Sequence, residues 1–208
     1  DAMESRGLGD VYKRQDNHGL NGKWKEGPGI PFFEKVFDKI NSKIILAEDL
    51  GEAYKDAKKI RDVFKIPGMK ILQFSFGNGD PYHEMDQNTV LYTGTHDNST
   101  CIGWFDELLN DKELNSEKNS INLVDEVIKY IDYKPSDLIH WNMILYAMSS
   151  KASYCIIPLQ DILGLNDNSR MNIPGTVGNN WLWRFKKETL TEAIKEKLKL
   201  ITKDVNRI

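Results

Sequence analysis

The feature that most constrains the fold of this chain is the alternation of short apolar runs with segments of helical character. Four runs have the length and composition of strands, at residues 43–48, 69–76, 90–92 and 152–159. Helices are predicted at residues 32–40, 52–64, 101–109, 121–131, 136–150 and 188–204. Strands that alternate with helices indicate parallel pairing through right-handed crossovers. A complete eight-stranded barrel needs roughly 250 residues, so the pattern predicts part of a barrel or a small doubly wound sheet.

Charge and cysteine content exclude several classes of function. The net charge of -3 and the pI near 5.9 provide no basic surface, which argues against nucleic acid as a partner. No apolar run approaches the 18 or so residues of a membrane span. Cys101 and Cys155 have neither disulfide-framework nor zinc-site spacing, so we predict a cytoplasmic, reducing compartment. The histidines are too irregularly spaced for a metal site, and neither a metal nor a cofactor is predicted.

Carboxylates follow two of the predicted strands directly. Glu48, the last residue of the run at 43–48, and Asp49 come directly after its apolar residues. His96-Asp97-Asn98 follow Val90–Tyr92 once Thr93-Gly94-Thr95 has broken the strand. In a parallel α/β barrel, catalytic groups lie at the carboxyl ends of the strands. A pair of carboxylates in such positions suits acid/base chemistry on a glycosidic bond. The simpler interpretation is a solvated helix cap for Glu48 and an N-cap for Asp49.

Several ordered motifs resemble the 4-α-glucanotransferases, the amylomaltases or disproportionating enzymes of glycoside hydrolase family 77. They are Asn21-Gly-Lys-Trp24, Leu46-Ala-Glu-Asp-Leu-Gly51, Pro67-Gly-Met-Lys70, Tyr92-Thr-Gly-Thr-His-Asp-Asn98, Pro158-Leu-Gln-Asp-Ile-Leu-Gly-Leu165, Arg170-Met-Asn-Ile-Pro-Gly175 and Asn180-Trp-Leu-Trp-Arg184. The resemblance implies an α/β fold, the C-terminal part of a (β/α)8 TIM barrel with helical insertions. It covers residues 16–208. Residues 1–15 match nothing downstream, and a foreign origin for this tail stays open.

The resemblance also implies a mechanism and roles for particular residues. The family retains configuration: an aspartate attacks, a glutamate acts as acid and then base, and a second aspartate stabilises the transition state. By motif, Glu48 resembles the acid/base and Asp97 the stabiliser. His96, Asp49 and Asn172 resemble groups that bind the substrate, although Asn172 has even odds of being only a loop residue. The implied partners are maltooligosaccharides and other α-1,4-glucans.

The family's nucleophile motif, Arg-x-Asp-His, does not occur in this sequence. Asp1 and Asp10 lie upstream of Asn21-Gly-Lys-Trp24 but have the wrong neighbours, so neither is assigned the role. We therefore predict that this chain alone has no transferase activity. Two alternatives stay open: a catalytically inactive maltooligosaccharide-binding protein, and an α-amylase-type hydrolase that shares the barrel and the carboxylates.

Three element-level predictions can be compared with a structure. Ser136, after Pro135, is the expected N-cap of the helix over 136–150. Asp161, directly after the fourth strand, is at least as well explained as a helix cap as by a ligand contact. The stripe of Leu190, Ile194, Leu198 and Ile201 on the last helix predicts core packing.

Overall fold

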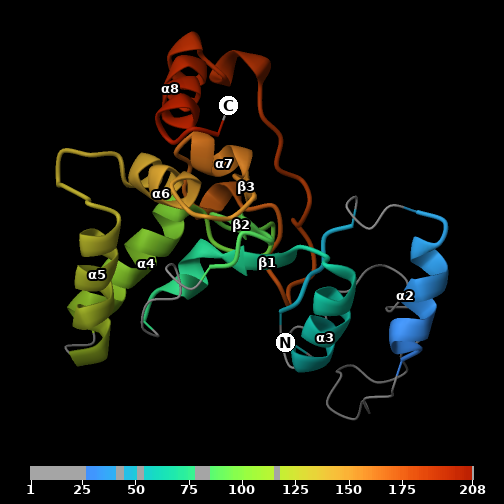
Figure 1. Cartoon of the computed structure of the whole chain (residues 1–208). Coiled ribbons are helices and arrows are strands. Elements are labelled where there is room, and N and C mark those ends of the chain that lie inside the picture. The colour runs from blue at the N-terminus through green and yellow to red at the C-terminus, as the bar shows by residue number, and fades with distance from the viewer. Residues whose placement is uncertain (1–26, 41–44, 51–53, 78–84, 115–117, 208) are drawn as a thin grey trace. The chain divides into compact units, whose positions relative to one another are not determined.

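A computed structural model describes residues 27–40, 45–50, 54–77, 85–114 and 118–207 (Figure 1). The chain divides into two compact units. The first contains residues 1–68 and 173–178, and the second contains residues 69–172 and 179–208. Each unit has its own packing.

In the first unit, two amphipathic helices meet through aromatic side chains. These helices are α2 (Gly29–Phe37) and α3 (Tyr54–Phe64). The ring of Phe64 lies 4.9 Å from that of Phe37 and 5.9 Å from that of Phe33, measured between centroids. Aromatic pairs at such distances add stability beyond their buried area. Both helices were predicted from the apolar period of the sequence.

The second unit is built on a small sheet. Its strands are β1 (Gly68–Ile71), which begins at the last residue of the first unit's main segment, β2 (Thr89–Tyr92) and β3 (Tyr154–Ile156), in the order β1-β2-β3. β2 and β3 are parallel, with Leu91 opposite Cys155. The crossover between them contains three helices: α4 (Cys101–Leu114), α5 (Lys118–Tyr130) and α6 (Ile139–Met148). The predicted α/β class with parallel pairing is confirmed.

The core of the second unit lies between the sheet and these crossover helices. Leu72 and Leu91 pack there against side chains of all three helices: Cys101, Phe105, Val127, Met143 and Ala147. A smaller cluster joins α6 to the last helix, α8 (Glu192–Asp204), where Ile194, Leu198 and Ile201 contact Trp141, Ile144 and Met148. Three residues of the predicted apolar stripe therefore pack into a core, whereas the fourth, Leu190, precedes α8 and lies outside this cluster. Short helical turns occupy Leu72–Ser75 (η3), Leu159–Ile162 (α7), Asp167–Ser169 (η4) and Lys187–Thr189 (η5).

Three of the predicted strands differ from the structure. The run at 152–159 is a strand only over Tyr154–Ile156, and Leu159 already belongs to α7. Residues 45–48 form no strand; the segment has one backbone hydrogen bond, from Ala47 N to Pro67 O (2.9 Å), and no ladder among the described residues. The run at 69–76 is a strand only to Ile71 and then turns as a 3₁₀ helix. A short apolar run does not distinguish a strand from a buried turn, because both bury consecutive residues.

The predicted Ser136 N-cap is also wrong. α6 begins at Ile139 after Leu138, whose side chain makes no capping bond. The preceding turn is held instead by Asp137, whose Oδ2 accepts from Lys134 N (3.0 Å) and Asn142 Nδ2 (3.3 Å). A carboxylate accepts more strongly than a hydroxyl, so it decides where this turn closes. At the other end of the crossover, α4 extends to Leu114, beyond the predicted end at residue 109.

Candidate functional site

The loop after β2 presents His96 and Asp97 on a tight turn. Asn98 Oδ1 accepts hydrogen bonds from Thr95 N (2.9 Å) and from Thr95 Oγ1 (2.7 Å). Gly94 leaves little space, because a Cβ there would lie 3.1 Å from Gln73 Nε2 and 3.3 Å from Ser99 O. The loop is therefore shaped by local polar contacts, to which Asp97 N adds a hydrogen bond to Thr95 Oγ1 (3.3 Å). This is the arrangement predicted for a strand end that carries function.

The carboxylate of Asp97 is partly exposed and held on one side. Its Oδ1 accepts from Asn172 Nδ2 (2.6 Å) and lies 3.3 Å from His96 Nε2. The backbone carbonyl of Asp97 accepts from Arg170 Nη2 (2.8 Å). Oδ2 has no partner among the described residues, and the side chain is 28% exposed. One oxygen is thus fixed by the protein while the other can accept a hydrogen bond from a bound molecule.

His96 belongs to an aromatic pair at the surface. Its ring lies 4.9 Å from that of Trp181, at an angle of 41°. Two backbone hydrogen bonds place Trp181 beside His96. The backbone N–H of Trp181 donates to Met171 O (2.6 Å), and the backbone N–H of Asn172 donates to His96 O (3.1 Å). Exposed aromatic faces beside hydrogen-bonding groups suit a ligand with an apolar face and a polar rim.

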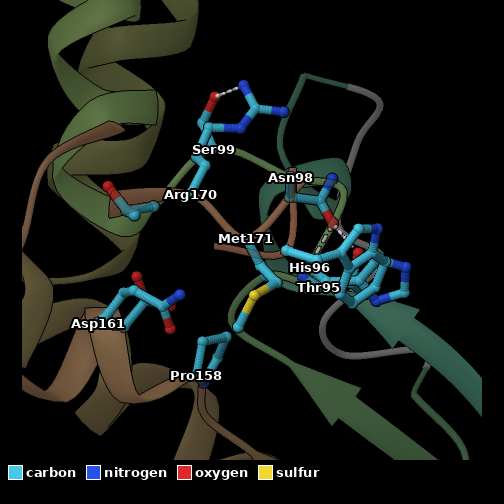
Figure 2. A pocket seen from close by; sticks show the side chains of 12 residues that line it. Thr95, His96, Asn98, Ser99, Pro158, Asp161, Arg170 and Met171 are labelled. Atoms are coloured by element: carbon cyan, nitrogen blue, oxygen red, sulfur yellow. Dashed lines mark hydrogen bonds between the residues drawn. The ribbon is translucent and has the colours of Figure 1, made fainter. Parts of the chain in front are cut away.

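A cavity of about 200 Å³ lies beside this pair (Figure 2). Its walls come from the loop after β2, from Pro158 and α7, and from Arg170, Met171 and Trp181. Figure 2 labels Thr95, His96, Asn98, Ser99, Pro158, Asp161, Arg170 and Met171 among the lining residues. Pockets that enclose a drug-sized ligand typically measure roughly 300–1,000 Å³. The cavity therefore fits one portion of a longer ligand better than a whole one.

The inner wall of the cavity includes a buried carboxyl group, that of Asp161. Asp161 is 1% exposed, and burial raises the pKa of its carboxyl. Its oxygens accept from Thr93 Oγ1 and from Cys101 N, at the start of α4. Asp161 therefore caps a helix, which is one of the two interpretations that the sequence allowed. The helix that it caps is α4, whereas Asp161 itself lies in α7. Burial and the neighbouring Asp161 raise the pKa of the Cys101 thiol well above its usual range, so this cysteine stays an unreactive thiol.

Glu48 and Asp49 belong to the first unit and differ from each other. Glu48 is exposed. Asp49 is 3% exposed, and its Oδ2 lies 2.6 Å from Arg61 Nη1. The backbone of Gly68 leaves room for this pair, because a Cβ on Gly68 would overlap Arg61 Nη1 and lie 2.7 Å from Asp49 Oδ2. The carboxylate of Asp49 is therefore buried and paired with Arg61, whereas the adjacent Glu48 is exposed to solvent.

Sequence reasoning missed Arg170 as a site residue. Its guanidinium bonds Asp97 O and Ser99 Oγ (3.2 Å) and lies 3.5 Å from Asp167 Oδ2. Its place in the motif Arg170-Met171-Asn172 was the available signal. Of the tryptophans, Trp141 is buried and Trp104 packs against the core, as expected, whereas Trp24 and the loop with Asp80 and His83 lie outside the described residues.

Two further features bear on the class of protein. Among the described residues, no group of three or more His, Cys, Asp or Glu side chains could hold a metal ion. Within the same residues, no helix combines the length and the apolar character needed to cross a bilayer.

Comparison with known proteins extends these observations. The family model of the 4-alpha-glucanotransferases matches residues 5–191. A 4-alpha-glucanotransferase of Synechocystis is 39% identical over 88% of this chain and 35% of its own length. The chloroplastic/amyloplastic 4-alpha-glucanotransferase of Solanum tuberosum is 41% identical over 81% of this chain and 28% of its own. This chain thus spans about a third of the length of the curated relatives that it matches.

A solved structure agrees with these sequence matches. The amylomaltase of Streptococcus agalactiae, solved in complex with acarbose, superposes with a TM-score of 0.77 at 33% sequence identity, covering 88% of this chain and 36% of that one.

Proposed function

This chain belongs to the 4-alpha-glucanotransferase family and has an α/β fold that forms part of the family's barrel; from this membership we propose a transferase that moves a segment of a 1,4-α-D-glucan to the 4-hydroxyl of an acceptor glucan or glucose. The reaction proceeds by double displacement with retention of configuration. The observation that carries the proposal is the turn after β2, which presents His96 and Asp97 at a strand end beside a cavity.

Asp97 is proposed to stabilise the transition state. The support is its half-held carboxylate: Asn172 fixes Oδ1, and Oδ2 has no partner among the described residues. A preorganised carboxylate stabilises positive charge as it develops on the sugar ring, because it needs no reorganisation at the moment of reaction. His96 and Asn172 bind the sugar in this proposal, with the His96–Trp181 pair as a stacking surface.

Glu48 is proposed as the general acid and base. Its support is chemical type and position: it is a carboxylic acid in the Leu46-Ala-Glu-Asp motif, its side chain faces solvent, and the next residue is anchored by Arg61. An acid that must reach a glycosidic oxygen cannot be occupied by a buried partner. Asp49 contributes to substrate binding in this scheme by fixing the chain beside Glu48.

Residues 16–208 are proposed as the C-terminal part of the catalytic barrel. The nucleophile motif Arg-x-Asp-His is absent from the sequence given, so the attacking carboxylate has no assigned residue here. We therefore keep the expectation that this chain alone leaves maltotriose unchanged. The origin of residues 1–15 stays a proposal that the coding sequence upstream can test.

The proposed partners are maltooligosaccharides and longer α-1,4-glucans, and the proposed compartment is a reducing one such as the cytoplasm. The support for the compartment is that both cysteines are free thiols, one of them buried. An oxidising compartment favours paired cysteines.

The test uses the protein extended in frame by its natural upstream coding sequence. With maltotriose as the only substrate, the extended protein should release glucose and form longer maltooligosaccharides, which chromatography resolves. Glu48→Gln and Asp97→Asn should each lower kcat by about 10²–10⁴. Glu196→Gln, an exposed carboxylate on α8, is the matched control and should leave the rate unchanged.

Three outcomes would contradict the proposal. Shortened products formed only with water would indicate a hydrolase. A folded extended protein that binds maltotriose without converting it would indicate the binding protein. Full activity in both carboxylate variants would remove their proposed roles.

A further inference from the structure

The loop that carries His96 and Asp97 is held at both ends by a single carboxylate. Asp161 Oδ2 accepts from Thr93 Oγ1 (2.6 Å), where the chain leaves β2. Asp161 Oδ1 accepts from Cys101 N (2.7 Å), the first residue of α4. Residues 94–100 lie between these two bonds. In Figure 2, Asp161 is seen on the opposite side of the cavity from Thr95 and His96.

Bulk water has little access to either of these bonds. Thr93 and Cys101 are fully buried, and Asp161 is 1% exposed. Bonds to an ionised acceptor are shorter and stronger than bonds between neutral groups. A variant that removes one of them leaves a buried polar group without its partner, and the chain must move to satisfy it. The separation of the two loop ends is therefore tied to the geometry of one side chain.

Stability alone does not explain a carboxylate at this position. Burial raises the pKa of Asp161, the negative charge of Asp167 acts in the same direction, and the bonds from Cys101 and Thr93 oppose them without prevailing. The ionised form is thus less favourable here than in water. Burying an ionised carboxylate costs free energy that its hydrogen bonds must offset. What a carboxylate offers here is two acceptors at a fixed spacing.

A second carboxylate, Asp167, makes a similar contact one residue before Cys101, at the last residue of the loop. Asp167 Oδ1 accepts from Thr100 N (2.8 Å) and from Thr100 Oγ1 (3.3 Å). Its other oxygen pairs with Arg170, which reaches Asp97 O. Asp161, Asp167 and Arg170 thus bind the loop at its ends and at its middle. Asn98 closes the turn within the loop.

We propose that Asp161 is a positioning residue of the glucan site: by binding Thr93 and Cys101 together, it fixes the loop 94–100 and so the place of Asp97 and His96. It does not touch the substrate and acts through Asp97. This inference rests on the proposed function for the catalytic role of Asp97. The two hydrogen bonds that Asp161 accepts from Thr93 and Cys101 do not depend on that role.

The first test is amide hydrogen exchange of the 208-residue chain, which requires no glucan. Thr93→Val removes the hydroxyl that binds Asp161, whereas Thr93→Ser keeps it. We expect exchange in peptides covering 94–101 to rise by about tenfold to a hundredfold in Thr93→Val. Thr93→Ser and the matched control Thr202→Val, which removes a hydroxyl bonded to Leu198 O on α8, should leave this loop as in the wild type.

A uniform rise across the peptides of α5, α6 and α8, or no change in the loop, would overturn the inference. Asp161→Asn provides a second variant, because its amide keeps one acceptor for Cys101 but loses the charge. Loop exchange should rise in it as well. If Asp161→Asn does not fold, the Thr93 pair still decides the question.

The second test is kinetic and uses the extended protein with maltotriose. A displacement of about 1 Å in a catalytic group can cost about a hundredfold in rate. Thr93→Val should therefore lower kcat by about tenfold or more with little change in KM, and Thr93→Ser should restore it. An equal kcat in both variants would contradict a positioning role. The extended protein could lack activity while Thr93→Val still raises exchange specifically in residues 94–101. The proposed function would then fail, and the conclusion that Asp161 fixes the loop would hold.

Discussion

The two segments that carry the proposed catalytic carboxylates are held in opposite ways. Asp49, beside Glu48, is anchored by Arg61, twelve residues ahead on the following helix. Asp97 is anchored by Asn172 and Arg170, 75 and 73 residues ahead. The first anchor includes an ion pair whose carboxylate is buried. The second is a set of hydrogen bonds around a partly exposed side chain.

The difference shows two ways of fixing a carboxylate in a segment that carries a proposed catalytic residue. A local anchor closes a short loop and forms with the helix that follows it, so the contact with Arg61 accounts for a large part of it. A distant anchor requires the whole crossover from β2 to β3 to be folded first, and it then spreads over several weaker contacts. We expect single substitutions to be severe in the first region and graded in the second.

Arg61→Ala should have the largest effect on stability. It removes the guanidinium that pairs with the buried carboxylate of Asp49, and breaking a buried ion pair typically costs about 3–5 kcal/mol. Urea unfolding followed by hydrogen exchange in α3 would measure it. Lys59→Ala, which breaks the exposed pair with Asp56, is the control and should stay within about 0.5 kcal/mol. Equal effects of the two variants would refute the importance of the local anchor.

Lowering the pH should affect the stability of the two regions differently, because His140 is buried in the second unit. This side chain on α6 is 6% exposed; burial, helped by the charge of Lys197, lowers its pKa to about 4. The unfolded chain has an ordinary histidine pKa near 6.5 and so binds more protons between pH 6.5 and 4. The stability present above pH 6.5 is therefore lost as the pH falls towards 4, by at most about 3 kcal/mol.

The measurement is urea unfolding across that pH window, compared with His140→Phe. The variant should lack this part of the pH dependence, and hydrogen exchange in α6 and α8 should report it, whereas α3 should not respond to the substitution. An identical pH profile in wild type and variant would mean that His140 is not buried as a neutral ring.

Matched glycine substitutions should show the same contrast at smaller scale. Gly68→Ala pushes a methyl group into the buried Arg61–Asp49 pair, and we expect a loss of about 1–3 kcal/mol. Gly94→Ala meets Gln73 Nε2 at 3.1 Å, a contact that a small shift relieves, so about 1 kcal/mol is expected. Thermal unfolding of the two variants side by side would test the order. A larger loss in Gly94→Ala would reverse the comparison.

Asn172→Ala should have the smallest effect on stability and a larger one on turnover. Water can reach the partly exposed Asp97, so the free energy of unfolding should fall by no more than about 1 kcal/mol. In the extended protein, kcat should fall by about tenfold because Asp97 is less well fixed. Asn168→Ala, on the exposed η4 turn, is the control for both measurements. A drop in stability without a drop in kcat would assign Asn172 a structural role only.

Much of the fold was readable from local sequence patterns. Apolar period located every helix of the crossover and the last helix, and a short apolar run followed by Thr93-Gly94-Thr95 located β2 and the turn after it. These features are local, because they depend on which residues lie on one face of one element. The same is true of the polar residues at the strand end, which the motif places together without any knowledge of the fold.

The tertiary structure decided which polar groups find one another. Residues 45–48 had the composition of a strand, yet no ladder forms among the described residues, because pairing depends on a neighbour and not on the segment itself. Asp49 was open as a cap and became half of an ion pair with Arg61. Asp161 caps α4, sixty residues before it in the chain, and Asn172 reaches back to Asp97. The sequence determined what each residue can donate or accept; only the closed crossover determined its partner, because contacts between residues 60 to 75 positions apart have no signature in local periodicity.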